Sequence, residues 1–172
     1  LFTIAYTGVN AGFIIGVADD PGMHSSQNEQ DSRHYAIASK VPMLEPSDSH
    51  ESIAFVKEAY EISEKFDTPV FLKMCTRVAH SQSVIEESER VLPAQKEYVK
   101  DGAKYIMMPG NAKKRHPIVE ARTVALTEYA ETAFFNRIED GSDNSIGIIT
   151  SSTSYQYVKE VFGDKYLVLK LG

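Results

Sequence analysis

The chain has 172 residues, 42% of them hydrophobic, and its 24 acidic side chains outnumber its 18 basic ones to give a formal net charge of −6. This composition is typical of a globular protein, and the acidic balance argues against a surface built to bind nucleic acid, which needs clustered Lys and Arg. The lone cysteine, Cys75, excludes an internal disulfide framework or a cysteine-ligated cluster within this sequence, and no run of about 18 apolar residues predicts a membrane span.

The first predicted strand lies in residues 11–18, AGFIIGVA, which are apolar without alternation. A short continuous apolar run is typical of a strand covered on both faces, as in a parallel sheet. The polar segment 19–33 that follows is rich in turn-forming residues and is predicted to be a loop at the carboxyl end of this strand. Open α/β sheets bind their ligands at that end, so the loop is a candidate site.

Helices and strands then alternate as far as residue 75. Residues 29–40 are predicted to be helical, 41–44 to form a short strand, and 70–75 to form another buried strand. Between them the clearest helix begins at Ser47 or Asp48, because Asp48 and Glu51 have the spacing of a capping box. Its apolar residues repeat at helical spacing and predict one face packed on a sheet. These are Phe55, Ala59, Ile62 and Phe66.

The middle of the chain has a different character. Residues 88–100 and 115–138 are predicted to be helical, and 81–143 to form a helical linker between domains. The basic cluster Lys113–Arg115 is interpreted as a solvated loop beside Pro117. After a boundary at 141–144, a strand, a helix and a second strand indicate the start of a new α/β unit.

The predicted fold class is therefore α/β, with a doubly wound and mostly parallel sheet. We expect residues 1–80 to form one domain, 81–143 the linker, and 144–172 the start of a second domain that is too short to bury a core alone. Because the sequence starts and stops inside apolar stretches, we expect it to be part of a longer polypeptide. The single cysteine fits a cytoplasmic protein.

The loop at 19–33 concentrates the polar groups that a ligand site would need. Hydroxyls, amides and backbone N–H groups would hold an anionic or heterocyclic ligand, and Arg33 would act as a carboxylate clamp. The alternative is a surface loop whose polar groups cap helices and turns, with Arg33 paired to Glu29. The candidate residues of the loop are Asp20, His24, Ser25, Ser26, Gln27, Asn28 and Arg33.

Further candidates follow the strand at 70–75. Arg77 and His80 are expected on the same rim of the sheet as the loop, where they would line the same cleft; the alternative for Arg77 is a pair with a helix-end carboxylate. Cys75 is interpreted as core within that strand rather than as a nucleophile. Histidines 24 and 34 lack the spacing of a metal site, so no metal is predicted, and Glu45 is expected to be structural.

Four segments carry a family resemblance. They read ADDPGMHSSQNEQDSRHYA, VPMLEPSDSHES, TPVFLKMCTRVAHS and IGIITSSTSYQYVKE, and only residues 88–143 are undistinctive. Together they closely resemble the alpha subunits of indolepyruvate ferredoxin oxidoreductases, which are thiamine-diphosphate-dependent 2-oxo acid ferredoxin oxidoreductases. The resemblance implies that residues 1–80 are the later half of a pyrimidine-binding domain and that 144–172 begin a domain like the carboxyl-terminal domain of transketolase.

The resemblance also implies a reaction. Enzymes of this family oxidatively decarboxylate aryl-2-oxo acids to acyl-coenzyme A on thiamine diphosphate with Mg, and pass electrons through iron-sulfur clusters to ferredoxin. A beta subunit, ferredoxin, coenzyme A and the 2-oxo acid are the implied partners of the intact enzyme. The family's activating glutamate would precede Leu1, and its Mg-diphosphate motif and cluster cysteines would follow Gly172, so this chain alone is expected to bind no cofactor and to be inactive.

Two alternatives stay open at this point. A sister enzyme that acts on pyruvate or on branched-chain 2-oxo acids shares the same chemistry, and a non-catalytic flavodoxin-like binding module shares the same pattern of elements. Within the leading interpretation, His24 and Arg33 are the residues expected to contact the substrate carboxylate. No catalytic step is assigned to a residue of this chain.

Overall fold

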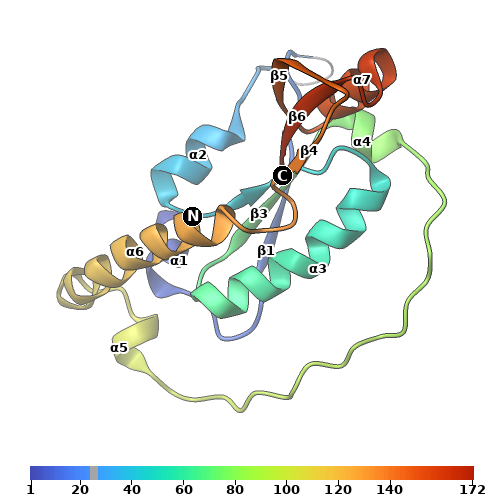
Figure 1. Cartoon of the computed structure of the whole chain (residues 1–172). Coiled ribbons are helices and arrows are strands. Elements are labelled where there is room, and N and C mark those ends of the chain that lie inside the picture. Colours follow the sequence, from blue (N-terminus) through green and yellow to red (C-terminus); the bar gives the residue numbers. More distant parts are fainter. Residues whose placement is uncertain (24–26) are drawn as a thin grey trace.

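The computed structural model describes residues 1–23 and 27–172. Within them the chain forms an α/β fold with two three-stranded sheets, which confirms the predicted class (Figure 1). The helices are α1 (Phe2–Thr7), α2 (Ser32–Ser39), α3 (Ser49–Phe66), α4 (Thr76–His80), α5 (Gly102–Tyr105), α6 (Pro109–Ala130) and α7 (Ser154–Phe162). The strands are β1 (Ile14–Ala18), β2 (Met43–Leu44), β3 (Val70–Met74), β4 (Arg137–Glu139), β5 (Asp143–Ser151) and β6 (Tyr166–Leu171).

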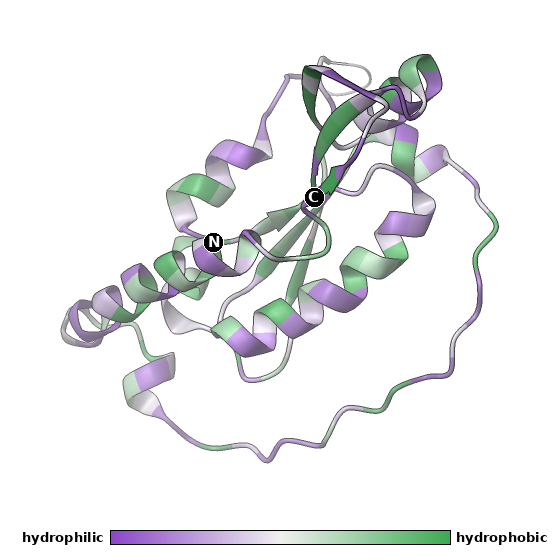
Figure 2. Ribbon diagram, viewed as in Figure 1, coloured by the Kyte–Doolittle hydropathy of each residue, from purple (hydrophilic) through white to green (hydrophobic). Residues whose placement is uncertain are grey.

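The first sheet, called sheet A, has the strand order β1-β3-β2 and is parallel throughout. Ile14 pairs with Val70 and Met43 pairs with Phe71, so the middle strand is β3. The first four residues of β3 are buried, and Figure 2 shows the three strands as apolar. The predicted parallel pairing is thus confirmed, and the predicted burial is confirmed for β3. It is wrong for β1, an edge strand in which no residue is buried and Gly16 and Ala18 are exposed.

Helices cover both faces of sheet A, which is the doubly wound arrangement that was predicted. On one face α3 packs Phe55, Ala59 and Ile62 into a core with residues of β2 and β3, to which Ala133 and Phe135 also belong. On the other face a smaller core joins α1 and α2 to β3. Its buried members are Ala5, Ala36, Val41 and Phe71.

Helix α3 begins where the capping signal places it. The carboxylate of its N-cap residue Asp48 accepts the backbone N–H of Glu51 at 2.8 Å. The carboxylate of Glu51 accepts the backbone N–H and hydroxyl of Ser47, each at 2.8 Å, so the return bond goes one residue further back than in a standard capping box. The helix ends at Phe66, because the C-cap residue Asp67 has a left-handed φ of 53°.

The predicted helix at 88–100 is wrong. Residues 81–101 contain no regular secondary structure, and all of them are exposed (Figure 1). Pro93 divides the segment, and apolar side chains such as Val91 and Tyr98 pack against no other element. A short helix in water is marginal without a packed face, so local helical preference alone does not form one here. We call residues 81–101 the arm.

The interpretation of Lys113–Arg115 as a solvated loop is also wrong, because these residues lie inside α6. The predicted helix at 115–138 in fact starts at Pro109, since proline fits the first turn where no backbone N–H is needed, and ends at Ala130. Arg115 donates to the backbone oxygen of Tyr6 at 2.7 Å and pairs with Asp67 at 2.9 Å. Helix α6 is thereby fixed against α1 and the end of α3.

The second sheet, called sheet B, has the order β4-β6-β5. Strands β5 and β6 are parallel and α7 lies between them in the chain, which confirms the predicted strand-helix-strand unit. Strand β4 was not predicted; it comes from the end of the segment 115–138 and pairs antiparallel with β6. In the described part of the chain no helix has both the length and the apolar character needed to cross a membrane.

Candidate functional site

The carboxyl ends of β1 and β3 meet at one edge of sheet A. The carboxylate of Asp20, just after β1, accepts the backbone N–H of Thr76 at 2.7 Å and also accepts the hydroxyl of Thr76, just after β3. The backbone N–H of Asp19 donates to the oxygen of Met74 at 3.1 Å. The predicted juxtaposition of the loop after Ala18 with the segment after Cys75 is therefore confirmed.

A cavity of about 260 Å³ opens beside this contact. We call it the edge pocket. It brings together three of the residues singled out from the sequence, Asp20, Asn28 and His80, although they are far apart in the chain. Its remaining lining residues are Ala18, Asp19, Gly22, Gln30, Met74, Cys75, Thr76 and Ala79.

Hydrogen bonds fix the segments around the edge pocket. The carboxylate of Asp19 accepts the backbone N–H of Ser32 at 2.6 Å, which places the start of α2 next to β1. The amide of Gln30 donates to the side-chain oxygen of Asn28 at 2.5 Å. Carboxylate, amide, hydroxyl and imidazole groups therefore surround one small cavity, which suits hydrogen bonding to a small polar group.

Cys75 does not lie inside the strand, as the sequence interpretation had it. It follows β3 as the N-cap residue of α4, is half-buried, and contributes to the wall of the edge pocket. Among the described residues no group of three or more His, Cys, Asp or Glu side chains is arranged to hold a metal ion. The edge pocket therefore offers hydrogen-bonding groups and a thiol.

Other residues singled out from the sequence lie elsewhere. Arg77 is not part of the lining of the edge pocket, and its guanidinium carbon lies 5.5 Å from the ring centre of Tyr157 of α7. Gln27 is exposed and outside the lining of that pocket. The candidates His24, Ser25 and Ser26 lie outside the described residues.

Arg33 occupies a second cavity rather than the edge pocket. Its Nε pairs with the carboxylate of Glu45 at 2.7 Å, so the alternative pairing with Glu29 is wrong. Glu45 also pairs with Lys73 of β3 at 3.4 Å, and both of these side chains are nearly buried. Glu45 thus follows β2 at the same carboxyl edge of sheet A, but on the opposite side of β3 from the edge pocket.

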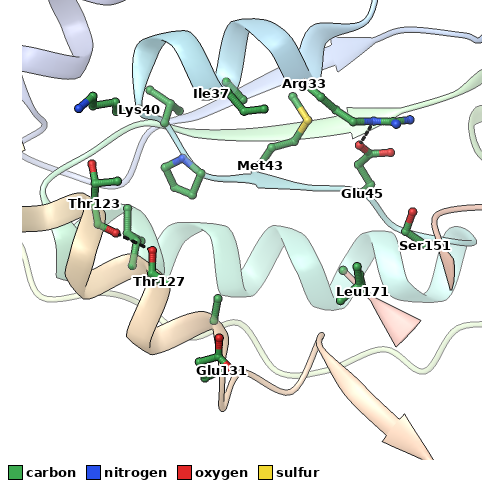
Figure 3. A pocket seen from close by; sticks show the side chains of 16 residues that line it. Arg33, Ile37, Lys40, Met43, Glu45, Thr123, Thr127, Glu131, Ser151 and Leu171 are labelled. Atoms are coloured by element: carbon green, nitrogen blue, oxygen red, sulfur yellow. Dashed lines mark hydrogen bonds and ion pairs between the residues drawn. The ribbon is translucent and has the colours of Figure 1, made fainter. Parts of the chain in front are cut away.

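This second cavity, of about 650 Å³, lies between α2 and α6 (Figure 3). We call it the α2–α6 cleft. Arg33, Ile37 and Lys40 of α2 form one wall, with Met43 of β2 below them. The facing wall comes from the second half of α6 and from the end of β6. It consists of Thr123, Leu126, Thr127, Ala130, Glu131, Leu171 and Gly172, with Ser151 beside Glu45.

A charged cluster between the two sheets was not anticipated from the sequence. Lys170 of β6 is fully buried, and its Nζ donates to Glu51 of α3 at 2.8 Å. Arg137 of β4 donates to the other oxygen of Glu51 at 3.0 Å and to Glu139 at 2.8 Å. The ammonium of Lys170 also lies 4.8 Å from the ring centre of Phe55. We call Glu51, Arg137 and Lys170 the inter-sheet cluster.

Its electrostatics follow from burial and pairing. Burial alone would raise the pKa of Glu51, but hydrogen bonds from Lys170, Ser47 and Arg137 outweigh it and lower this pKa from 4.5 to about 2. Burial lowers the pKa of Lys170, and the hydrogen bond to Glu51 opposes that change. The carboxylate is therefore charged at neutral pH, and it compensates the buried ammonium.

Comparison with known proteins identifies subunits that are similar to this chain in sequence. No family model matches it. It is 40% identical to the indolepyruvate oxidoreductase subunit IorA of Methanothermobacter thermautotrophicus over 98% of the chain and 28% of that subunit. The IorA subunits of Thermococcus kodakarensis and Archaeoglobus fulgidus are 39% and 36% identical, over 96% and 99% of the chain. The chain spans little more than a quarter of the length of these relatives, and the resemblance noted from the sequence is confirmed.

Proposed function

We propose that this chain is the portion of an indolepyruvate oxidoreductase alpha subunit that forms one wall of the active site at the carboxyl edge of sheet A. The observation that carries the proposal is the identity of about 40% over nearly the whole chain. The edge pocket supports it, since ligands of open α/β sheets bind at the carboxyl ends of the strands. The reaction would be oxidative decarboxylation of an aryl-2-oxo acid, with transfer of the acyl group to coenzyme A and of electrons to ferredoxin.

Thiamine diphosphate would supply the nucleophilic carbon and the electron sink of this reaction. The edge pocket fits an uncharged carbonyl or aminopyrimidine group, because Asn28, Thr76 and His80 offer hydrogen bonds there, whereas the carboxylates of Asp19 and Asp20 would repel an anion. It does not fit the Mg-diphosphate part, since the described residues hold no cluster of metal ligands. We therefore assign this chain contacts to the substrate and to uncharged parts of the cofactor, and no step through the diphosphate or the iron-sulfur clusters.

The two sheets support a division of the chain that follows the family's organisation. In this proposal sheet A belongs to a pyrimidine-binding domain and sheet B to the domain that follows it, and the predicted linker 81–143 lies between them except for β4, which joins sheet B. The beta subunit is the proposed partner of the complete alpha subunit.

The test replaces His80 by Ala in the complete alpha subunit, assembled with its partner subunit, and measures ferredoxin reduction driven by indolepyruvate. His34→Ala is the matched control, because His34 is exposed on α2 outside the lining of the edge pocket. We expect kcat/KM to fall about tenfold or more for His80→Ala and to stay unchanged for His34→Ala.

Rates with pyruvate and with a branched-chain 2-oxo acid complete the test. Faster turnover of either than of indolepyruvate would replace the proposed substrate by that of a sister enzyme. No turnover of any 2-oxo acid by the assembled complex would favour the non-catalytic binding module. Equal kcat/KM values for the His80 and His34 variants would show that the edge pocket is not part of the active site.

A further inference from the structure

We propose that the α2–α6 cleft binds an aryl carboxylate, with the aromatic ring between α2 and α6 and the carboxylate on Arg33. The inference deepens the proposed function, because it names a place that holds the side chain of an aryl-2-oxo acid. The choice of an indole ring rests on the proposed function. The cleft lies next to the edge pocket around the start of α2. Asp19, which lines the edge pocket, accepts a hydrogen bond from the backbone N–H of Ser32. Arg33, which lines the cleft, follows Ser32 in the chain.

The walls of the cleft suit a flat apolar group. Ile37 and Met43 lie on one side of it (Figure 3), Leu126 and Ala130 of α6 also line it, and half of its sixteen lining residues are apolar. Its volume of about 650 Å³ lies within the range of roughly 300–1,000 Å³ that is usual for sites of small organic ligands. An indole ring placed there would remove its own apolar surface and that of the walls from water.

Arg33 supplies a donor for an anion at one end of the cleft. Both of its ion pairs, to Glu45 and to Asp31, are made by Nε. Among the described residues its two terminal nitrogens have no hydrogen-bond or ion-pair partner, and the side chain is 55% exposed. Two adjacent N–H groups of a guanidinium match the two oxygens of a carboxylate.

The charges along the cleft direct an anion towards that end. Arg33 pairs with Asp31 and shares Glu45 with Lys73, so these four side chains sum to zero formal charge and the terminal N–H groups of Arg33 supply the attraction. At the far end of α2, Lys40 is already paired with Glu120 of α6. The carboxylate of Glu131, on the opposite wall, repels an anion from its side. A ligand with one aromatic end and one carboxylate end would therefore bind in a single orientation.

The experiment uses the chain as it stands and indole-3-acetate as the probe. The chain contains no tryptophan, so the indole fluorescence of the probe is measured without protein indole in the background. We expect a saturable change in fluorescence at millimolar probe concentration. Arg33→Met should weaken binding about tenfold, whereas 3-methylindole, which lacks the carboxylate, should bind the wild type and this variant equally.

Two further pairs of variants check the location of the ring and the role of the guanidinium. Ala130→Leu narrows the cleft and should weaken binding, while Ala121→Leu, exposed on the same helix outside the cleft, should leave it unchanged. Arg33→Lys keeps the charge without the paired N–H groups and should bind less tightly than wild type. Arg90→Met, which removes an exposed arginine of the arm, is its control.

The absence of saturable binding would overturn the proposal, and so would binding that neither Arg33→Met nor Ala130→Leu weakens. These outcomes are separate from those of the activity assay. If the assembled complex is active but this chain binds no indole-3-acetate, the proposed function stands and the proposal for the cleft is rejected. If binding depends on Arg33 but the assembled complex turns over no 2-oxo acid, the proposal for the cleft stands and the proposed function is rejected.

Discussion

Sheets A and B are stabilised in different ways. Sheet A lies between helices on both faces, and its middle strand contributes Val70, Phe71 and Leu72 to two apolar cores. In sheet B the only buried apolar residue of the strands is Val168, within the described part of the chain, and α7 has no buried residue at all. The fully buried side chain that sheet B directs at α3 is a lysine, Lys170.

This difference predicts two kinds of sensitivity. Apolar burial depends on shape and volume and is indifferent to pH, so sheet A should respond to changes in side-chain size. A buried ion pair is stable only while both partners are charged and present, so the attachment of sheet B should respond to loss of either charge. Four measurements test this comparison, in order of decreasing expected effect.

Glu51→Gln should have the largest effect. It leaves the ammonium of Lys170 buried without a carboxylate, and loss of one partner of a buried pair costs about 3–5 kcal/mol of unfolding free energy. Hydrogen exchange should show lost protection in β5 and β6 and little change in β3. Glu61→Gln, exposed on the same helix, is the control. Uniform loss of protection in both sheets would contradict the comparison, and adding Lys170→Met should restore part of the stability.

Acidification should have the next largest effect. Because the pKa of Glu51 is about 2 in the folded chain and ordinarily 4.5, its contribution is complete above pH 4.5 and is lost as the pH falls towards 2. The difference corresponds to about 3 kcal/mol of unfolding free energy. Denaturant titrations at several pH values should show this slope in the wild type and a smaller slope in Glu51→Gln. Equal slopes would mean that other carboxylates carry the acid sensitivity.

Ile62→Val should have a moderate effect. Ile62 is nearly fully buried in the core between α3 and sheet A, and removal of one methylene there leaves a small cavity. We expect a loss of about 1 kcal/mol that is the same at pH 7 and at pH 4. A loss that depends on pH would show that the core and the inter-sheet cluster are coupled rather than independent.

Ile149→Val is the matched change in sheet B and should have the smallest effect. Ile149 of β5 is 71% exposed, so the same methylene is removed from a side chain that packs against little. We expect a change below about 0.5 kcal/mol in unfolding free energy. A loss as large as that of Ile62→Val would mean that another surface covers this face of sheet B in solution.

The parts of the fold that the sequence predicts are those with local signals. Strand β1 is a continuous apolar run, β3 is apolar except for Lys73, and α3 combines a capping residue with apolar residues at helical spacing, so their positions follow from short stretches of sequence. The arm and β4 were missed for the opposite reason. The arm's residues favour a helix but have nothing to pack against, and β4 exists because β6 lies beside it.

The candidate site divides in the same way. The shared edge of Asp20 and His80 follows from the rule that parallel strands end together, and this expectation was met. The partner of Arg33 was not predicted, because Glu45 reaches it across the fold while Glu29 is nearer in sequence. The pairing of Lys170 with Glu51 joins residues 119 positions apart. A lysine within an apolar strand gives no local sign of such a partner.

The exposed arm also has a consequence for chain connectivity. Its 21 residues are held by a few polar contacts at the surface, such as those of Lys96 with Glu64 and of Ser88 with Lys57. A segment of this kind affects the free energy of folding mainly through the entropy of loop closure, and that entropy changes slowly with the number of residues in the segment. Trypsin should therefore cut here first, after Arg90, Lys96 or Lys100, and the two products should stay associated. The same segment should accept an inserted domain, or the new termini of a circular permutant, without rearrangement of either sheet.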